Sequence, residues 1–225
     1  MKRLIKKLLS ESIIYEVIDS LLDEDYPSNW NVEEFKSLTS FNARMKYCQV
    51  NLQRISSGSG RIVYMIDNEK VLKLARNKKG VAQNEVEVQY SREHMLEDIV
   101  ATIFNAEPNN LWVEMELARK LTTKSFKQLV GVSFELFAQA VSNYGSDANG
   151  DNRGGGRYNI PQETVDELWE NEFIYGIFQL IGNYGIPAGD LMKTSSYGIV
   201  KRNGEDIVVM IDYGLTSEVY DSYYS

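Results

Sequence analysis

The stretch VNLQRISSGSGRIVYMIDNEKVLKLA, residues 50–75, decides most of what the sequence predicts about the fold. Two runs with extended-chain composition, residues 50–55 and 61–66, flank a loop of serine and glycine. A third run, Val71–Ala75, follows the turn formers of residues 67–70. Apolar and β-branched runs separated by such turns are typical of antiparallel strands. The stretch therefore predicts a meander of three strands.

The residues after the meander extend this pattern. A helix is expected after Asn77-Lys78-Lys79-Gly80, and strands are expected at residues 99–104 and 111–117 with a loop at 105–110 between them. The first part of the chain is thus predicted to run through three strands, one helix and two strands.

Helical patterns dominate the rest of the chain, apart from one hairpin signature near the end. The remaining predicted elements are helices at 2–24, 31–46, 124–143 and 162–183, a Gly-, Asn- and Asp-rich loop at 145–156, and a hairpin at 198–210 that turns at Asn203-Gly204.

Composition narrows the class of protein. The net charge of -8 argues against a general nucleic-acid binder, because such proteins need clustered Lys and Arg to displace counterions from phosphates. Cys48 and His94 are the only cysteine and histidine, which excludes a Cys/His zinc site, so any metal must be bound by oxygen. No stretch reaches the roughly 18 apolar residues of a membrane span, and the basic first nine residues lack a cleavage site. We expect a cytoplasmic protein without a membrane span.

Four short motifs occur in one order along the chain. They are Ser57-Gly58-Ser59-Gly60-Arg61, Val71-Leu72-Lys73-Leu74-Ala75, Ala188-Gly189-Asp190-Leu191 and Ile211-Asp212-Tyr213-Gly214. Glycines such as Gly58 and Gly60 let backbone N–H groups approach phosphate oxygens with no Cβ in the way. Asp212 ends a hydrophobic strand in which a carboxylate has no packing role. In this order the motifs resemble the nucleotide-binding parts of the protein-kinase-like superfamily, in the style of small kinase-like proteins of tailed bacteriophages.

The resemblance covers about Asn51–Gly214 and implies a bilobal α+β fold. Its N-lobe would hold a five-stranded antiparallel sheet with one helix, and its C-lobe would be mainly helical and reduced, because little of the sequence follows the last motif. We expect an N-terminal helical extension at 1–49, the N-lobe at 50–117 and the C-lobe at 118–225. The cleft between the lobes would bind ATP and Mg²⁺.

In this resemblance Lys73 is the strand lysine that reaches the α- and β-phosphates, and it needs a carboxylate partner from the next helix. Glu85 is the favoured partner, because it shares one helical face with Val81 and Val88 and two apolar residues indicate the inward side. Glu87 is the second choice.

The other ATP contacts implied by the resemblance come from the loop and from a later strand. Gly58, Ser59 and Gly60 would contact phosphate oxygens. Backbone groups of Glu114 to Glu116 would bind the adenine edge.

Two aspartates carry the chemistry that the resemblance implies. Asp190 corresponds to the catalytic-loop aspartate that orients the acceptor hydroxyl, with Ala188 in place of the family's histidine. Asp212 corresponds to the magnesium-binding aspartate. Ser195 or Ser196 stands where the family has a second metal ligand, an asparagine, and a serine is a poorer ligand for magnesium.

Two interpretations of different classes follow. The first is a minimal ATP-dependent phosphotransferase that uses Lys73, Asp190 and Asp212. The second is a pseudokinase, which would act as a binding module for a protein partner or as a structural protein of a phage virion. The location would then be the host cytoplasm or the virion.

Overall fold

The computed structural model describes residues 29–149 and 157–223 of the chain. The helix predicted at 2–24 and most of the loop predicted at 145–156 lie outside the described residues. In chain order the elements are α2 (Val32–Ser37), α3 (Phe41–Asn51), β1 (Gln53–Ser57), β2 (Arg61–Met65), β3 (Lys70–Ala75), α4 (Lys78–Tyr90), η1 (His94–Leu96), β4 (Ile103–Ala106), β5 (Trp112–Glu116), β6 (Arg119–Lys120), α5 (Thr123–Val130), α6 (Phe134–Asn149), α7 (Gln162–Glu170), α8 (Glu172–Gly182), α9 (Ala188–Leu191), η3 (Thr194–Ser196), β7 (Tyr197–Arg202), β8 (Glu205–Met210) and α10 (Ser217–Tyr223).

A five-stranded antiparallel sheet, in the order β1-β2-β3-β5-β4, forms the first half of the molecule. The predicted meander is confirmed, except that Val50 belongs to α3 and the first strand begins at Gln53. The strand predicted at 99–104 is shorter than expected, since β4 begins only at Ile103.

The pleat sorts the residues of this sheet onto two faces, because successive side chains of a strand point in opposite directions. One face packs on α2 and α3 and forms a core of its own. It holds Phe35, Cys48, Ile62, Tyr64, Leu72, Leu74 and Trp112. The register pairs Arg61 with Ala75 and Val63 with Lys73, which places both basic residues on the opposite face.

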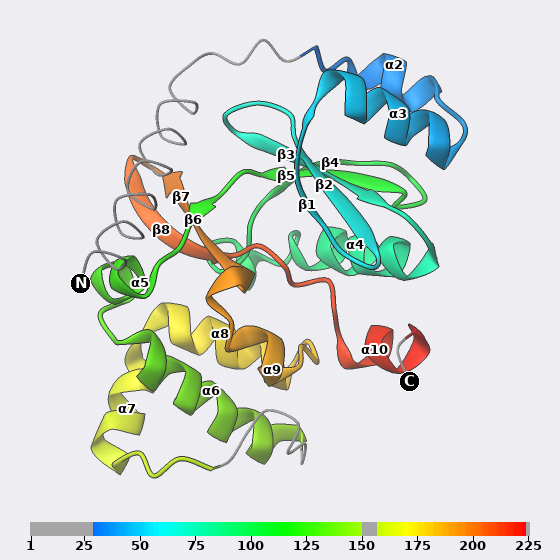
Figure 1. The fold of residues 1–225 in the computed structure, drawn as a ribbon. Coiled ribbons are helices and arrows are strands. Elements are labelled where there is room, and N and C mark those ends of the chain that lie inside the picture. Colours follow the sequence, from blue (N-terminus) through cyan, green and yellow to red (C-terminus); the bar gives the residue numbers. More distant parts are fainter. Residues whose placement is uncertain (1–28, 150–156, 224–225) are drawn as a thin grey trace, which may run out of the picture.

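Helix α4 lies on the side of the sheet away from α2 and α3, as Figure 1 shows. Its N-cap is Asn77, whose side chain accepts a hydrogen bond from the Gly80 amide. The helices α5 to α9 gather beyond it around a second core, in which α6 packs against α8.

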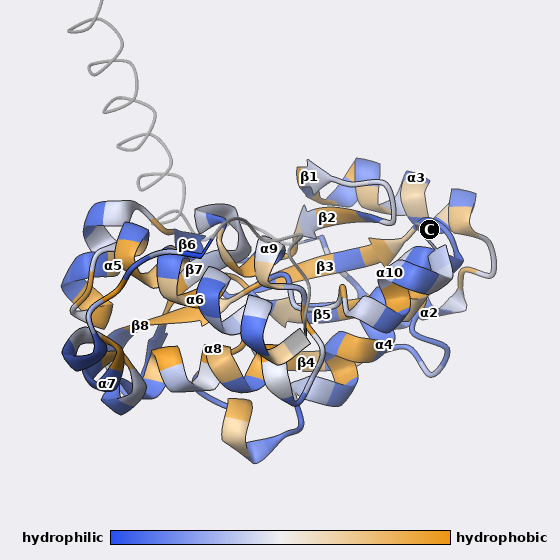
Figure 2. Ribbon diagram, turned by 90° about the horizontal axis from the view of Figure 1, so that it is seen from below, coloured by the Kyte–Doolittle hydropathy of each residue, from blue (hydrophilic) through white to orange (hydrophobic). Residues whose placement is uncertain are grey.

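Each of the two long helices predicted in this part is divided in two. Gly131, with a φ of 91°, ends α5 in a left-handed cap, and Asn171 ends α7 and caps α8. In Figure 2 much of α8 and β8 is coloured hydrophobic, in keeping with their burial.

The closing hairpin is confirmed as β7 and β8. Asn203 and Gly204 both have positive φ, 53° and 87°, as a two-residue hairpin turn requires. Met210 at the end of β8 also forms a parallel bridge to Val100. Hydrogen bonds join the Met210 amide to Ile99 O at 2.8 Å and the Ala101 amide to Met210 O at 2.9 Å. The segment that carries Asp212 is thereby joined to the chain between α4 and β4.

The fold class is thus α+β, with helices α2 and α3 ahead of a five-stranded antiparallel sheet, one packed helix and a mainly helical second half. Within the described ranges, none of the helices combines the length and the apolar composition needed to cross a membrane.

Candidate functional site

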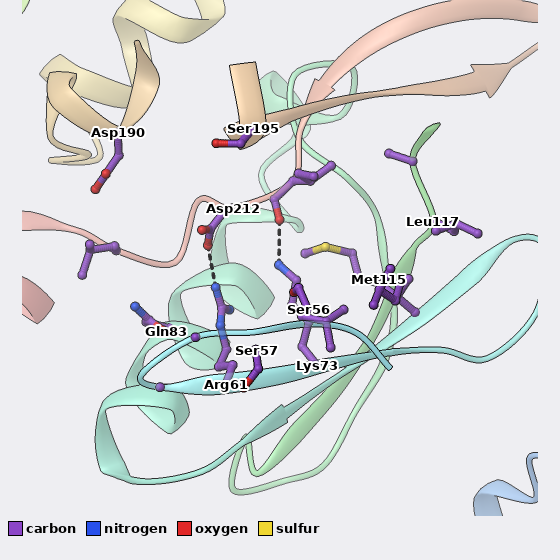
Figure 3. Close-up of a pocket in the computed structure, with 18 of the residues that line it drawn as sticks. Ser56, Ser57, Arg61, Lys73, Gln83, Met115, Leu117, Asp190, Ser195 and Asp212 are labelled. Carbon is purple, nitrogen blue, oxygen red and sulfur yellow. Dashed lines mark hydrogen bonds and ion pairs between the residues drawn. The ribbon is translucent and has the colours of Figure 1, made fainter. Parts of the chain in front are cut away.

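A cavity of about 610 Å³ lies between the five-stranded sheet and the segments that carry Asp190 and Asp212. Figure 3 shows Arg61 and Lys73 reaching from the sheet toward the segment that carries Asp212, with Asp190 and Ser195 on the far side. Of the predicted site residues, those that line the cavity are Gly58, Ser59, Gly60, Lys73, Glu116, Asp190, Ser195 and Asp212.

Lys73 is held by Glu87, not by Glu85. Its ammonium lies 2.9 Å and 3.0 Å from the two carboxylate oxygens of Glu87, which is fully buried, and it donates to Ile211 O at 2.7 Å. Burial lowers the pKa of Lys73 below its ordinary value, and the ion pair with Glu87 only partly offsets this effect.

The preference for Glu85 was wrong, because the inward face of α4 is not the one that its valines indicate. Glu85 is exposed. The buried residues of the helix are Gly80, Gln83, Asn84 and Glu87, at the spacing of a single helical face.

Arg61 is a site residue that the sequence analysis did not single out. Its Nη1 lies 2.7 Å from Glu87 Oε2, and its Nη2 lies 2.6 Å from Asp212 Oδ1. Burial alone would lower the pKa of Arg61, but Glu87 and Asp212 outweigh it and raise the pKa, so the guanidinium stays charged. The alternation of strand residues was the available signal, since it places Arg61 on the face of Lys73.

The position of Asp212 is fixed by the residues that follow it. Tyr213 is fully buried and donates its hydroxyl to Ala101 O at 2.7 Å. A Cβ on Gly214 would lie 2.4 Å from Gln83 O, so only glycine fits against α4 there. The Asp-Tyr-Gly motif is therefore packed against α4, while the Asp212 carboxylate itself remains largely exposed to the cavity.

The glycine loop is fastened to the start of α4. Gly60 O accepts from the Arg76 amide at 2.8 Å, and Ser59 O accepts from the Asn77 side chain at 3.0 Å. The Gly58 amide donates to Arg61 O at 2.8 Å and closes the turn. The loop thus lies over the cavity in a defined conformation.

Asp190 enters the cavity from α9. Its Oδ1 lies 2.6 Å from Lys193 Nζ, and its backbone oxygen accepts from the Ser196 hydroxyl at 2.7 Å. Ser195 lines the cavity, whereas Ser196 is buried outside the lining. The prediction of Ser196 as a metal ligand is corrected, because its hydroxyl is engaged with the backbone.

Part of the cavity lining is apolar, with Met115 and Leu117 on the side away from Asp190 (Figure 3). Val63, Val71 and Ala118 also line the cavity, and apolar walls of this kind suit a flat ring.

Of the two glutamates predicted to meet the adenine edge, only one lines the cavity. Glu114 does not line it, since the pleat directs its carboxylate to the other face, where it accepts from the Trp30 indole at 2.8 Å. Glu116 does line the cavity, but its amide donates to Thr102 O and its carboxylate is paired with Arg202 at 2.8 Å. The Leu117 amide donates to Glu69 O.

The residues present do not fit the magnesium site that the resemblance implied at Asp212, Ser195 and Ser196. Magnesium requires oxygen ligands in near-octahedral geometry. One oxygen of Asp212 is paired with Arg61, and the Ser196 hydroxyl is directed to Asp190 O. In the part of the chain that the structure describes, no three His, Cys, Asp or Glu side chains form a metal-binding group.

The sequence matches no family model, and no curated protein matches it. Among solved structures, it is similar to the ternary complex of streptomycin, ATP and APH(2'')-IIa, at 15% identity and a TM-score of 0.36 over 79% of this chain and 72% of that one. The ADP-bound aminoglycoside phosphotransferase APH(2'')-Ib is similar at 13% identity and a TM-score of 0.36, over 79% and 71% of the two chains. The gentamicin complex of APH(2'')-IIa has 13% identity and a TM-score of 0.33, over 79% and 70%. These similarities concern the fold and assign no residue a role.

Proposed function

We propose that the protein binds a nucleoside triphosphate, with ATP as the first candidate, in the cavity between the sheet and Asp212. One observation carries this proposal. The Lys73 ammonium is fixed by Glu87 and by Ile211 O beneath a glycine loop, on the wall of a cavity large enough for such a ligand. A buried ammonium with a fixed orientation is suited to bind phosphate oxygens.

The cavity lining supports one orientation of the ligand. The base would occupy its apolar part, beside Met115 and Leu117. The phosphates would extend past Lys73 toward Gly58 and Gly60. Magnesium is not part of this proposal, because Arg61 is paired with one oxygen of Asp212 and the Ser196 hydroxyl donates to Asp190 O.

Thermal unfolding with ATP, in magnesium buffer and in EDTA, tests the proposal. A ligand that binds only the folded state stabilises it by about 2.7 kcal/mol at a hundredfold excess over Kd, so a rise in Tm in either buffer supports it. Lys73→Met should abolish the rise. Lys70→Met, at the start of the same strand and outside the cavity lining, is the matched control and should retain it. No shift of the unaltered protein in either buffer at millimolar ATP would contradict the proposal.

Phosphotransfer is the second candidate, and the position of Asp190 on the same cavity favours it over a pure binding module. In such a reaction Asp190 would accept the proton of an acceptor hydroxyl while that oxygen takes the γ-phosphoryl group and ADP leaves. The ion pair with Lys193 must open for Asp190 to do so.

Autophosphorylation or phosphate release from labelled ATP tests this second candidate. Asp190→Asn should abolish the signal but preserve the thermal shift. Asp166→Asn, on the exposed surface of α7, is the control. ATP binding with no transfer in the unaltered protein would leave the pseudokinase interpretation.

A further inference from the structure

Arg61, the arginine beside Asp212, lines the cavity and is held there by neighbouring side chains. Arg61 is buried, and its Nη2 lies 2.6 Å from Asp212 Oδ1 while its Nη1 lies 2.7 Å from Glu87 Oε2. Asn84 Oδ1, at 3.4 Å, is a further acceptor for Nη1. The guanidinium is thus held in one orientation by three side chains of two separate elements.

This contact places a fixed positive charge where the resemblance predicted a divalent cation. A magnesium ion on Asp212 would compete with the guanidinium for the same carboxylate. It would also bring two further positive charges next to Arg61 and Lys73 in a partly buried place, where Coulomb repulsion is weakly screened. Arg61 is therefore the physical reason why Asp212 is poorly placed to bind magnesium.

The same guanidinium is suited to phosphate. An arginine offers more N–H donors than its contacts with Glu87, Asn84 and Asp212 use, in a planar fork that matches phosphate oxygens. Arg61 lines the cavity, and the register places it on the face of Lys73, so both cations face one ligand.

We propose that the cavity binds the metal-free form of a nucleoside triphosphate, with Arg61 in the place of the divalent cation. This inference rests on the proposed nucleotide binding. Asp212 acts in it as a positioning residue that orients Arg61, not as a metal ligand.

Titration of the unaltered protein with ATP, in EDTA and in excess MgCl₂, is the first test. ATP should bind more tightly in EDTA than in excess MgCl₂, because magnesium converts most of the ATP into its magnesium complex and little of the metal-free form remains. ATP that binds as tightly or more tightly with magnesium would overturn the inference and leave the proposed function intact. Absence of binding in both buffers would overturn the two together.

Asp212→Asn provides a test of opposite sign. An asparagine oxygen still accepts from Arg61, and the loss of a negative charge beside the phosphates should leave ATP binding unchanged or tighter in both buffers. Loss of binding in the magnesium buffer alone would identify Asp212 as a metal ligand and overturn the inference.

Arg61→Gln tests the guanidinium itself. In EDTA it should weaken ATP binding by about tenfold or more, and Arg61→Lys should recover part of the loss, because it retains the charge without the fork. Arg92→Gln, which removes an exposed arginine outside the cavity, is the control for net charge. Unchanged binding by a folded Arg61→Gln protein, in EDTA, would overturn the inference. If Arg61→Gln does not fold, the comparison of ATP binding in the two buffers and the Asp212→Asn variant still test the inference.

Discussion

Gly60 and Gly80 meet backbone to backbone, so that a Cβ added to Gly80 would lie 2.1 Å from Gly60 O. No flexible side chain could yield to relieve such a contact. The meeting point joins the glycine loop to the first turn of α4, and it depends on the absence of a side chain at position 80.

Gly80→Ala should therefore lower the free energy of unfolding by about 1–3 kcal/mol, the usual cost of overpacking. Urea unfolding measures it. Gly58→Ala is the matched control, because the nearest atom to its Cβ would be Arg61 O at an ordinary 3.9 Å. Equal effects of the two substitutions would contradict the close contact.

Glu87→Gln should be strongly destabilising, whereas Glu85→Gln should not. Glu87 is fully buried and neutralises Lys73 and Arg61, and removing one partner of a buried ion pair costs about 3–5 kcal/mol. Glu85 is exposed, so its replacement should stay within about 0.5 kcal/mol. Urea unfolding of the two proteins side by side is the measurement. A larger loss for Glu85→Gln would mean that α4 turns its other face inward.

Tyr213→Phe should lower the free energy of unfolding by about 1–2 kcal/mol. It removes the hydroxyl that donates to Ala101 O and leaves a buried carbonyl unpaired. Tyr223→Phe, at an exposed position in α10, should have little effect and is the control. If both variants unfold at the same urea concentration as the unaltered protein, the hydroxyl does not hold the Asp-Tyr-Gly segment.

Cys48 should make the protein less stable at alkaline pH. Burial raises the pKa of its thiol from 9.0 to about 12, with a smaller opposing effect of a backbone hydrogen bond. Above the unfolded value the unfolded state loses a proton that the folded state retains, so the free energy of unfolding falls as pH rises toward the folded value. The slope approaches about 1.4 kcal/mol per pH unit.

Urea unfolding of the unaltered protein and of Cys48→Ala, at about pH 8 and about pH 10, isolates this contribution. The loss between the two pH values should be smaller in the variant, whatever its absolute stability. Identical losses would show that other groups, such as the buried tyrosines, account for the alkaline instability.

The parts of the fold that the sequence predicted are those set by strong local signals. Turn formers between apolar runs defined the meander, and Asn203-Gly204 defined the last hairpin. The long helical patterns at 124–143 and 162–183 were assigned correctly in type but not in extent. The left-handed Gly131 and the capping Asn171 break them, and the spacing of the apolar residues in the sequence does not reveal either break.

The candidate site was harder to predict, because its buried surfaces are polar. Val81 and Val88 indicated one face of α4, but the face that packs inward is made of small and polar residues that meet the glycine loop and the two cations. Arg61 is the first residue of a strand, a position at which an arginine is ordinarily exposed. Only the pairing of Val63 with Lys73 reveals that it shares a face with the lysine.

Among the residues that the structure describes, the strand before the glycine loop is the outermost of its sheet. There β1 pairs with β2 alone, its register is irregular between Arg54 and Ser56, and all five of its residues are exposed. Its amide hydrogens should therefore exchange with solvent faster than those of the central strand β3, since edges open with the least loss of contact. The glycine loop therefore adjoins the part of the sheet that opens most readily, whereas Lys73 is carried by the central strand, which should open last.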